Sequence, residues 1–187
     1  MKKIILIIMM LPFWLTSQTT YVPDDNFENY LEANGMGDGI PLNNYVLTAS
    51  INGVTVLDIS SDSISDLTGI EGFVSLTDLN CTNNQITNLD LSSNTLLTDL
   101  KISANLLSNI NVSLLNNLTY LSCRNNQIAN LDLSSNTALD YLDCSYNSLT
   151  NLDVSMLNNL TNLNCGSNSI VTLDVSQNTN LTNLITD

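Results

Sequence analysis

The hydrophobic positions of this chain recur with a fixed period up to Asn180, in five consecutive blocks of equal length that begin at Leu76, Leu97, Leu118, Leu139 and Leu160. Counted from the first leucine of each block, positions 1 and 4 are always leucine, position 6 is cysteine or isoleucine, and position 9 is always asparagine. Position 11 is isoleucine or leucine, positions 14 and 16 are apolar, and serine follows at position 17. A strict short period of this kind is typical of a repeat protein in which one structural unit stacks on the next.

Positions 4 and 6 predict a short strand at the start of each block. Residues two apart lie on the same face of a strand, so these positions point inward and positions 3, 5 and 7 point outward. One such strand cannot bury its apolar face alone. We therefore expect the blocks to stack, with parallel strands about 4.8 Å apart over a continuous leucine core.

The invariant asparagine of position 9 follows each strand, where the backbone bends and loses its ladder partners. An amide side chain offers two donors and an acceptor, which can satisfy those backbone groups inside the protein. We interpret this column as a structural asparagine ladder. Its members are Asn84, Asn105, Asn126, Asn147 and Asn168.

The four cysteines, Cys81, Cys123, Cys144 and Cys165, share position 6, and Ile102 takes that position in the remaining block. Four cysteines in an exported chain suggest two disulfides, but a single inward column favours small buried core residues with free thiols. A disulfide between Cys123 and Cys144, or between Cys144 and Cys165, is the alternative, although in-register parallel strands rarely offer its geometry. Zinc is less favoured still, because the chain has no histidine. We expect no metal and no cofactor.

The N-terminus has the pattern of a secretory signal peptide over residues 1–17. Lys2 and Lys3 precede an apolar run, residues 4–15, and the small or polar pair Thr16-Ser17 follows it. The run is short for a membrane span, and no cysteine follows it to carry a lipid. Its removal leaves two basic against 18 acidic side chains, a net charge of −16. We expect a secreted chain, extracellular or at the cell surface, that inserts in no membrane after cleavage and binds no nucleic acid.

Residues 18–53 are expected to form an N-terminal helical cap. Asp24 and Asp25 precede Phe27, Tyr30 and Leu31, whose spacing of three and four predicts an amphipathic helix that ends near Gly35. This helix would cover the open edge of the first strand. The repeats are expected over 54–75, 76–96, 97–117, 118–138, 139–159 and 160–180, with a partial block over 181–187. The first of them is one residue longer than the others and has Asp62 in place of the asparagine. The short last block is either an edge strand or the mark of a truncated sequence.

The consensus L-x-x-L-x-C-x-x-N-x-[IL]-x-x-L-D-[LV]-S resembles the leucine-rich repeat, in the short form of internalin-like bacterial surface proteins and especially of secreted Bacteroidetes, flavobacterial-type proteins. The resemblance covers residues 54–187, and residues 21–51 resemble the N-terminal cap of that group. It implies an α/β repeat solenoid: a right-handed coil with one parallel β-sheet on its concave face, a convex side that is irregular or made of short strands, and an N-terminal helical cap. Resembling proteins often continue into further repeats and a C-terminal sorting domain.

The parts of a catalytic site are scarce, because the chain has no histidine and only one lysine and one arginine after residue 17. We expect no enzyme activity. The carboxylates of position 15 are interpreted as solvated or backbone-capping groups rather than calcium ligands. They are Asp90, Asp132, Asp153 and Asp174. The stretch 34–39 is interpreted as a turn.

The outward positions 3, 5, 7 and 8 vary from block to block and carry the candidate site. Tyrosine offers a rigid apolar face with a polar tip, and arginine offers a planar fork of donors. We predict a recognition patch on the concave face, formed by Tyr120, Arg124, Tyr141 and Tyr146. The full set of candidate ligand-binding residues is Asp78, Asp99, Lys101, Tyr120, Arg124, Tyr141, Asp143 and Tyr146. A purely structural interpretation is that the cations offset nearby carboxylates and the tyrosines pack across strands.

These patterns and the resemblance together predict a non-catalytic, monomeric binding module whose partner is a protein of unknown identity. A glycan-binding adhesin module is one alternative, and a structural spacer of a larger, truncated surface protein is another. The column of threonines at position 2 is compatible with binding of ice or a mineral surface, but the preference of threonine for strands is a sufficient local explanation of the column.

Overall fold

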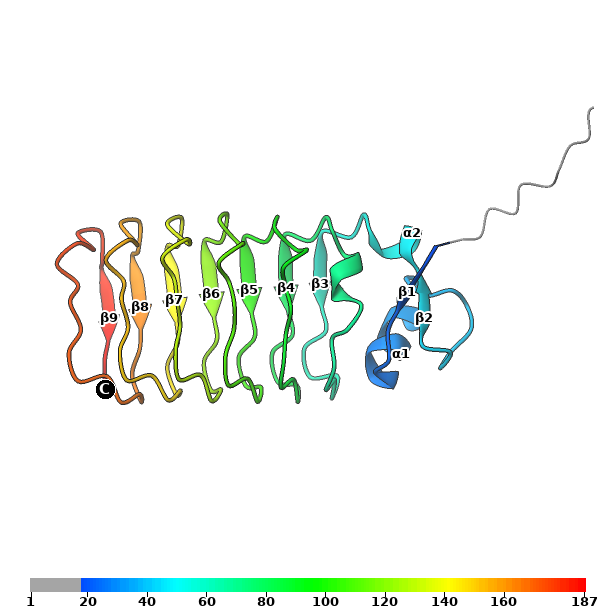
Figure 1. The fold of residues 1–187 in the computed structure, drawn as a ribbon, viewed down its shortest axis with the longest axis horizontal. Coiled ribbons are helices and arrows are strands. Elements are labelled where there is room, and N and C mark those ends of the chain that lie inside the picture. Colours follow the sequence, from blue (N-terminus) through cyan, green and yellow to red (C-terminus); the bar gives the residue numbers. More distant parts are fainter. Residues whose placement is uncertain (1–17) are drawn as a thin grey trace, which may run out of the picture.

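The structure is a computed structural model that describes residues 18–187; the signal peptide predicted for residues 1–17 lies outside the described residues. The described chain forms a small N-terminal cap followed by one long coil (Figure 1). Seven three-residue strands of the coil pair in chain order into a single parallel sheet. They are β3 (Val56–Asp58), β4 (Asp78–Asn80), β5 (Asp99–Lys101), β6 (Tyr120–Ser122), β7 (Tyr141–Asp143), β8 (Asn162–Asn164) and β9 (Asn183–Ile185). The predicted α/β repeat solenoid is confirmed.

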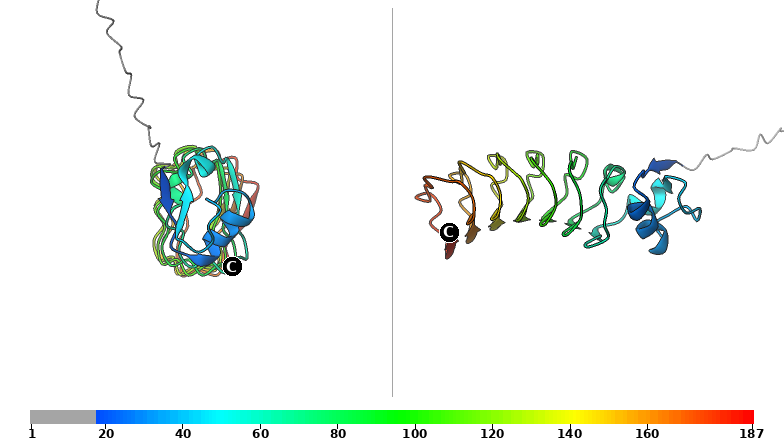
Figure 2. Two further views of the ribbon diagram at one scale, coloured as in Figure 1. Left: turned by 90° about the vertical axis from the view of Figure 1, so that its right-hand side faces the viewer. Right: turned by 90° about the horizontal axis from the view of Figure 1, so that it is seen from below.

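The strands stay in register with the repeat. Each residue of β4 pairs with the residue of β5 that holds the same repeat position, and every later pair of strands keeps that register. Seen along the axis the coils superimpose, and seen from below the strands line one side of a shallow arch (Figure 2). Over the described residues, the opposite side consists of irregular segments, turns and bends, with a short 3-10 turn in the first coil.

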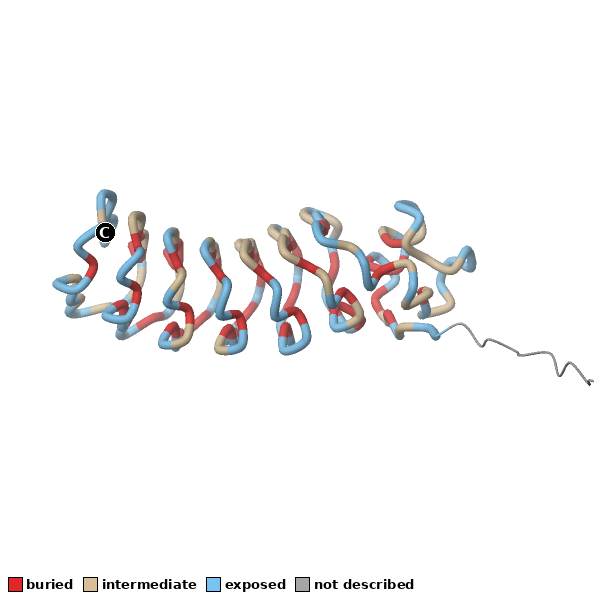
Figure 3. The backbone as a smooth tube through the Cα atoms, turned by 90° about the horizontal axis from the view of Figure 1, so that it is seen from above, coloured by how far each residue is buried: buried red, intermediate tan, exposed pale blue. Residues whose placement is uncertain are grey.

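The core is a set of buried columns that run the length of the coil. Leucines at positions 1 and 4 and the apolar residues at positions 11, 14 and 16 are buried in most of the coils (Figure 3). The four cysteines are buried and free, so the disulfide alternative does not hold in this structure. Burial raises the pKa of the Cys81 and Cys123 thiols to about 12, which keeps them protonated at neutral pH. Towards β9 the burial fades, because no further coil covers that strand among the described residues.

The asparagines of position 9 tie neighbouring coils together. The Nδ2 group of Asn105 donates to the carbonyl oxygens of Cys81 (2.9 Å) in the preceding coil and Ile102 (3.2 Å) in its own coil. Its Oδ1 atom accepts from the Ile86 N–H at 3.0 Å. Asn84, Asn126, Asn147 and Asn168 repeat this arrangement. The column therefore bonds the backbone where each strand ends, as its chemistry predicts.

A second column of buried asparagines, Asn94, Asn136 and Asn178, occupies position 19 of alternate coils, and the sequence interpretation missed it. Leu115 and Leu157 take that position in the coils between them. Each Nδ2 group donates to two backbone carbonyls, but the Oδ1 atoms are buried without a hydrogen-bond partner in the described chain. The alternation of asparagine and leucine from block to block was the signal that could have revealed this column.

The cap contains the predicted helix, α1 (Asp25–Ala33), and elements that the sequence did not indicate. These are the antiparallel ribbon of β1 (Thr19–Tyr21) and β2 (Tyr45–Leu47), the short helix α2 (Thr48–Ile51), and the 3-10 turn η1 (Ile70–Gly72) in the first coil. Asp24 caps α1 through Oδ1, while its Oδ2 accepts from the Ser65 N–H (2.8 Å) and the Asp66 N–H (3.1 Å) of the first coil. One carboxylate thus joins cap and solenoid.

Candidate binding surface on the parallel sheet

The outward side chains of β3 to β9 and of the turns after them form one continuous surface, which we call the sheet face. Because the strands are in register, residues of one repeat position stand side by side. Asp99, Tyr120 and Tyr141 are consecutive in the position 3 column, and Lys101, Ser122 and Asp143 are consecutive in the position 5 column. Residues that are far apart in the chain are therefore neighbours on this surface.

Tyr120 and Tyr141 form a stacked pair at the centre of the sheet face. Their ring centroids are 4.3 Å apart with an interplanar angle of 5°, and both residues are half-buried. The ammonium nitrogen of Lys101 lies 5.4 Å from the centroid of the Tyr120 ring. Burial, reinforced by Tyr141 and the carboxylates of Asp143 and Asp99, raises the pKa of Tyr120 to about 12. The Tyr120 hydroxyl is therefore uncharged at neutral pH.

Arg124 and Tyr146 form a second pair, at the turn that follows the strands. The Arg124 guanidinium carbon lies 4.6 Å from the centroid of the Tyr146 ring, a cation–π distance. Tyr146 has a left-handed backbone with φ of 55°, as have Asn83, Ala104 and Asn125 at the same repeat position. The turn imposes this conformation on whatever residue stands there, and it places Tyr146 at the surface with 52% of its area exposed.

The three predicted carboxylates of the sheet face are held by their own neighbours to different extents. One oxygen of Asp78 accepts from the Thr77 hydroxyl at 2.7 Å, and one oxygen of Asp99 accepts from the Thr98 hydroxyl at 3.3 Å. Asp143 differs from the expectation for an outward position, because only 7% of its area is exposed. Its Oδ1 accepts from the N–H and hydroxyl of Ser145 at 3.0 and 2.6 Å, which turns the carboxylate back onto its own chain.

The structure divides the predicted site residues into two groups along the sheet. Lys101, Tyr120 and Tyr141 form one contiguous cluster, with Arg124 and Tyr146 at the turns beyond it. Asp78 lies on β4, beside a hollow of about 120 Å³ that Asp58, Asp99 and Lys101 also line, so Lys101 borders both groups. Asp58 pairs with Asn80 and so stands in the position 5 column with Lys101, a place that the alignment of Asp62 with the asparagine column could have revealed.

The carboxylates of the opposite side cap turns. In Asp90, Asp132, Asp153 and Asp174 an Oδ1 atom accepts from the serine N–H two residues later, at 2.8 to 2.9 Å. Hydrogen bonds from those serines lower the pKa of each of the four carboxyls. These groups are therefore engaged with the backbone of their own coil.

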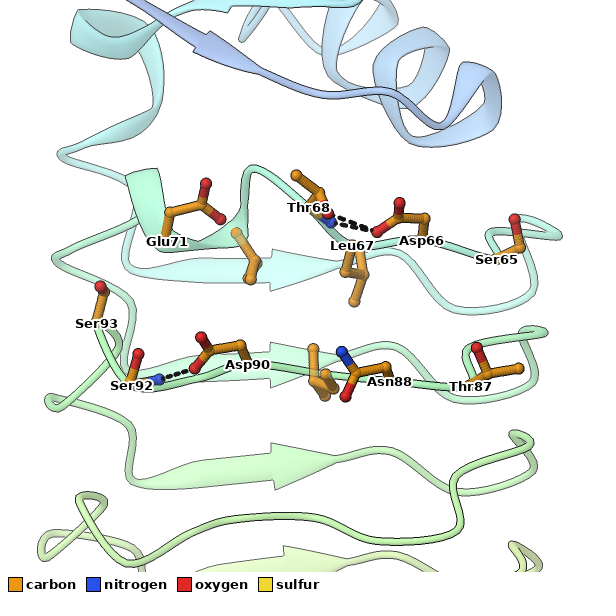
Figure 4. Close-up of a pocket in the computed structure, with 12 residues that line it drawn as sticks. Ser65, Asp66, Leu67, Thr68, Glu71, Thr87, Asn88, Asp90, Ser92 and Ser93 are labelled. Atoms are coloured by element: carbon orange, nitrogen blue, oxygen red, sulfur yellow. Dashed lines mark hydrogen bonds between the residues drawn. The ribbon is translucent and has the colours of Figure 1, made fainter.

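A hollow of about 650 Å³ lies between the first two coils on that opposite side (Figure 4). Asp66, Glu71 and Asp90 line it, and each carboxylate accepts a hydrogen bond from a backbone N–H of its own turn. Within residues 18–187 no group of three or more candidate side chains could hold a metal ion. The described part of the chain also contains no helix of the length and apolarity that crossing a membrane requires.

No model of a known protein family matches the chain. In sequence, 75 residues are 42% identical to Internalin J of Listeria monocytogenes; they represent 40% of this chain and 8% of that protein. In structure, the functional domain of InlJ from Listeria monocytogenes, which includes a cysteine ladder, superimposes with a TM-score of 0.82 at 42% identity. That match covers 90% of this chain and 38% of the InlJ chain, so this chain spans well under half of that relative.

Two further solved structures support the fold. A leucine-rich-repeat protein of Leptospira interrogans superimposes with a TM-score of 0.68 at 27% identity, covering 71% of this chain and 37% of that one. An internalin (inlF) from Listeria monocytogenes gives a TM-score of 0.67 at 22% identity, over 91% of this chain and 59% of that one, which bears on the fold alone. The repeat register, the asparagine ladder and these relatives together show that the chain has the leucine-rich-repeat fold and is similar to internalins in sequence and structure.

Proposed function

We propose that this chain is a non-catalytic, monomeric binding module that recognises another protein through the sheet face and acts outside the cell or at its surface. The signal-peptide pattern of residues 1–17 supports the location. The recognition patch of Tyr120, Arg124, Tyr141 and Tyr146 is the part of the sheet face that we assign to the partner. Aromatic rings and arginine are the side chains that carry most binding energy in protein interfaces.

Tyr146 is the observation that carries this proposal. A left-handed conformation costs a bulky residue about 1–2 kcal/mol, and Tyr146 recovers little of this by burial, since 52% of its area is exposed. Asn83 and Asn125 stand at the same position of other coils, and asparagine tolerates the conformation better. A residue that weakens the fold and displays a ring to solvent is better explained by binding than by stability.

The Tyr120 and Tyr141 stack supports a glycan as the second candidate partner. Two parallel, half-exposed rings beside the Asp99 carboxylate suit a sugar, whose C–H groups stack on rings while its hydroxyls bond to carboxylates. The protein and glycan hypotheses place the ligand on the same patch. They differ in which class of molecule the protein captures.

The test compares capture by the parent chain and by variants from a panel of surface proteins and from a glycan array. We expect Tyr120→Ala/Tyr141→Ala to abolish capture with an unchanged circular dichroism spectrum. Tyr146→Asn should weaken capture while leaving the fold as stable as before or more so. Tyr45→Ala, which removes an exposed tyrosine of the cap, is the matched control and should capture as the parent does. Capture that survives the double substitution would remove the proposal, and capture of glycans alone would favour the second candidate.

A further inference from the structure

Four outward side chains of the sheet face, Lys101, Ser103, Ser122 and Arg124, form a square on two neighbouring strands. Lys101 of β5 stands directly opposite Ser122 of β6. Ser103 and Arg124 follow two residues later, where the Ala104 N–H still donates to the Arg124 carbonyl at 2.8 Å. With strands about 4.8 Å apart and about 3.3 Å per residue, the Cα atoms of the two cations are about 8 Å apart across the diagonal.

The other diagonal of the square holds two hydroxyls. The Oγ atoms of Ser103 and Ser122 are 2.8 Å apart, and the Ser103 hydroxyl is also 3.2 Å from the Ser122 carbonyl oxygen. Each serine hydroxyl carries one proton, and either hydroxyl can donate its proton to the other. If the Ser103 proton is used within the pair, the Ser122 proton remains for a ligand.

Both cations keep donors for a ligand, because their close contacts are with rings. Lys101 rests against Tyr120, and Arg124 rests against Tyr146. A ring restrains a cation but takes none of its hydrogen bonds, so an ammonium with three donors and a guanidinium with five remain free to bind. The carboxylates around the square are engaged with their own chain: Asp99 and Asp143 accept from Thr98 and Ser145, and Asp58, which lines a hollow together with Lys101, accepts from the Ser60 N–H.

The net charge of the chain makes this placement significant. The chain has 18 acidic and four basic side chains, and Lys101 and Arg124 are the two basic residues of the described part. Both stand at one square of the sheet face. A strongly acidic surface repels polyanions at long range, so the square favours a ligand that brings one negative charge rather than many.

We propose that this square binds a carboxylate of the protein partner, an exposed aspartate or glutamate side chain, with Arg124 as the bidentate donor and Lys101 and Ser122 as further donors. This assignment rests on the proposed function, since it names what the partner presents to the sheet face. Tyr120 and Tyr146 then flank the carboxylate and contact the residues on either side of it.

The experiment titrates the ¹⁵N-labelled protein with a short peptide blocked at both ends that contains one glutamate, and with the same peptide carrying glutamine. We expect saturable shifts of the Arg124 Nε–H signal and of the Ser103 and Ser122 amides with the glutamate peptide alone. Arg124→Gln should weaken binding about tenfold, since it removes a charge-assisted contact.

Two charge variants sharpen the test. Asp143→Asn removes the carboxylate that borders Ser122 while its amide oxygen can still accept from Ser145, and we expect it to tighten peptide binding several-fold. Asp174→Asn makes the same change in net charge on the opposite side of the coil and should leave binding unchanged.

Equal shifts with both peptides, or binding that is indifferent to Arg124→Gln, would overturn the assignment. If a singly sulfated monosaccharide shifts the same signals and the glutamate peptide does not, the ligand of the square is a sulfate ester. That result would equally overturn the assignment to a carboxylate. The proposed function fails separately, if Tyr120→Ala/Tyr141→Ala leaves protein capture intact.

Discussion

The substitution Asn105→Leu removes an amide that joins two coils and replaces it with an apolar side chain of the same branching and the same number of non-hydrogen atoms. The Ile86 N–H loses the Oδ1 acceptor at 3.0 Å and becomes a buried donor without a partner. The Cys81 and Ile102 carbonyls each lose one hydrogen bond but keep a second, from Asn84 and Asn126 respectively. A third, longer hydrogen bond to the Ser103 carbonyl (3.3 Å) is also lost, and that carbonyl keeps the Asn83 N–H. The damage is therefore one unsatisfied group and three weakened ones.

The expected loss of stability follows from these contacts. A buried unsatisfied donor costs about 1–3 kcal/mol, and each of the two shorter hydrogen bonds that are lost contributes about 0.5–1.5 kcal/mol. We expect Asn105→Leu to lower the free energy of unfolding by about 3–4 kcal/mol, a large share of the roughly 5–15 kcal/mol that is typical of folded proteins.

Asn136→Leu is the matched control, because it makes the same exchange at an equally buried site. The Val112 and Leu115 carbonyls that Asn136 bonds also accept from the backbone N–H groups of Leu115 (2.9 Å) and Leu118 (3.1 Å). The substitution also removes the unpaired Oδ1 atom of Asn136. We expect a change of less than about 1 kcal/mol, of either sign.

Urea unfolding followed by far-ultraviolet circular dichroism measures both variants against the parent, with the slopes compared to exclude a change in the unfolded state. Equal losses in the two variants, or a loss below about 1 kcal/mol for Asn105→Leu, would refute the argument that the position 9 amides alone satisfy these backbone groups.

Three further predictions concern the cap, the tyrosine stack and the thiols. Burial opposes ionisation of the Asp24 carboxyl, but hydrogen bonds from the Ser65 backbone and side chain outweigh burial and lower the pKa of Asp24. The ionised carboxylate therefore stabilises the fold above about pH 4. This stabilisation is lost as the pH falls through the lowered pKa. Asp24→Ala should flatten that acid limb of a melting-temperature profile and lower stability by about 2–3 kcal/mol at neutral pH. Since the pKa of Tyr120 is raised to about 12, the contribution of the neutral Tyr120 side chain to stability is intact below about pH 10 and disappears as the pH rises through 12. An ultraviolet titration of the Tyr141→Phe variant should show Tyr120 ionising at a lower pH than in the parent. Among the thiols, Cys165 should react first with a disulfide reagent because it lines a hollow near β9, whereas Cys123 should react only on unfolding. Mass spectrometry of the labelled chain measures the order of reaction. Early labelling of Cys123 would contradict this prediction.

The sequence by itself determined the solenoid, because the contacts between neighbouring coils join residues about one repeat apart. Leu79, Leu100 and Leu121 recur at the same spacing that brings them together, so a period in the sequence is also a map of the core. The same logic located the asparagine ladder, whose bonds span adjacent coils. The repeat also predicted that Tyr120 and Tyr141 lie side by side on one surface, where the structure shows them stacked.

Only the tertiary structure decided the features that no period encodes. Asp24 meets Ser65 across a long stretch of non-repeating sequence, and the β1–β2 ribbon pairs Thr19 with Leu47, so neither contact leaves a local pattern. Burial of Asp143 depends on which way its carboxylate turns, and Ser145 decides that. The contacts of Lys101 with the Tyr120 ring and of Arg124 with the Tyr146 ring likewise depend on side-chain conformations, which no period encodes.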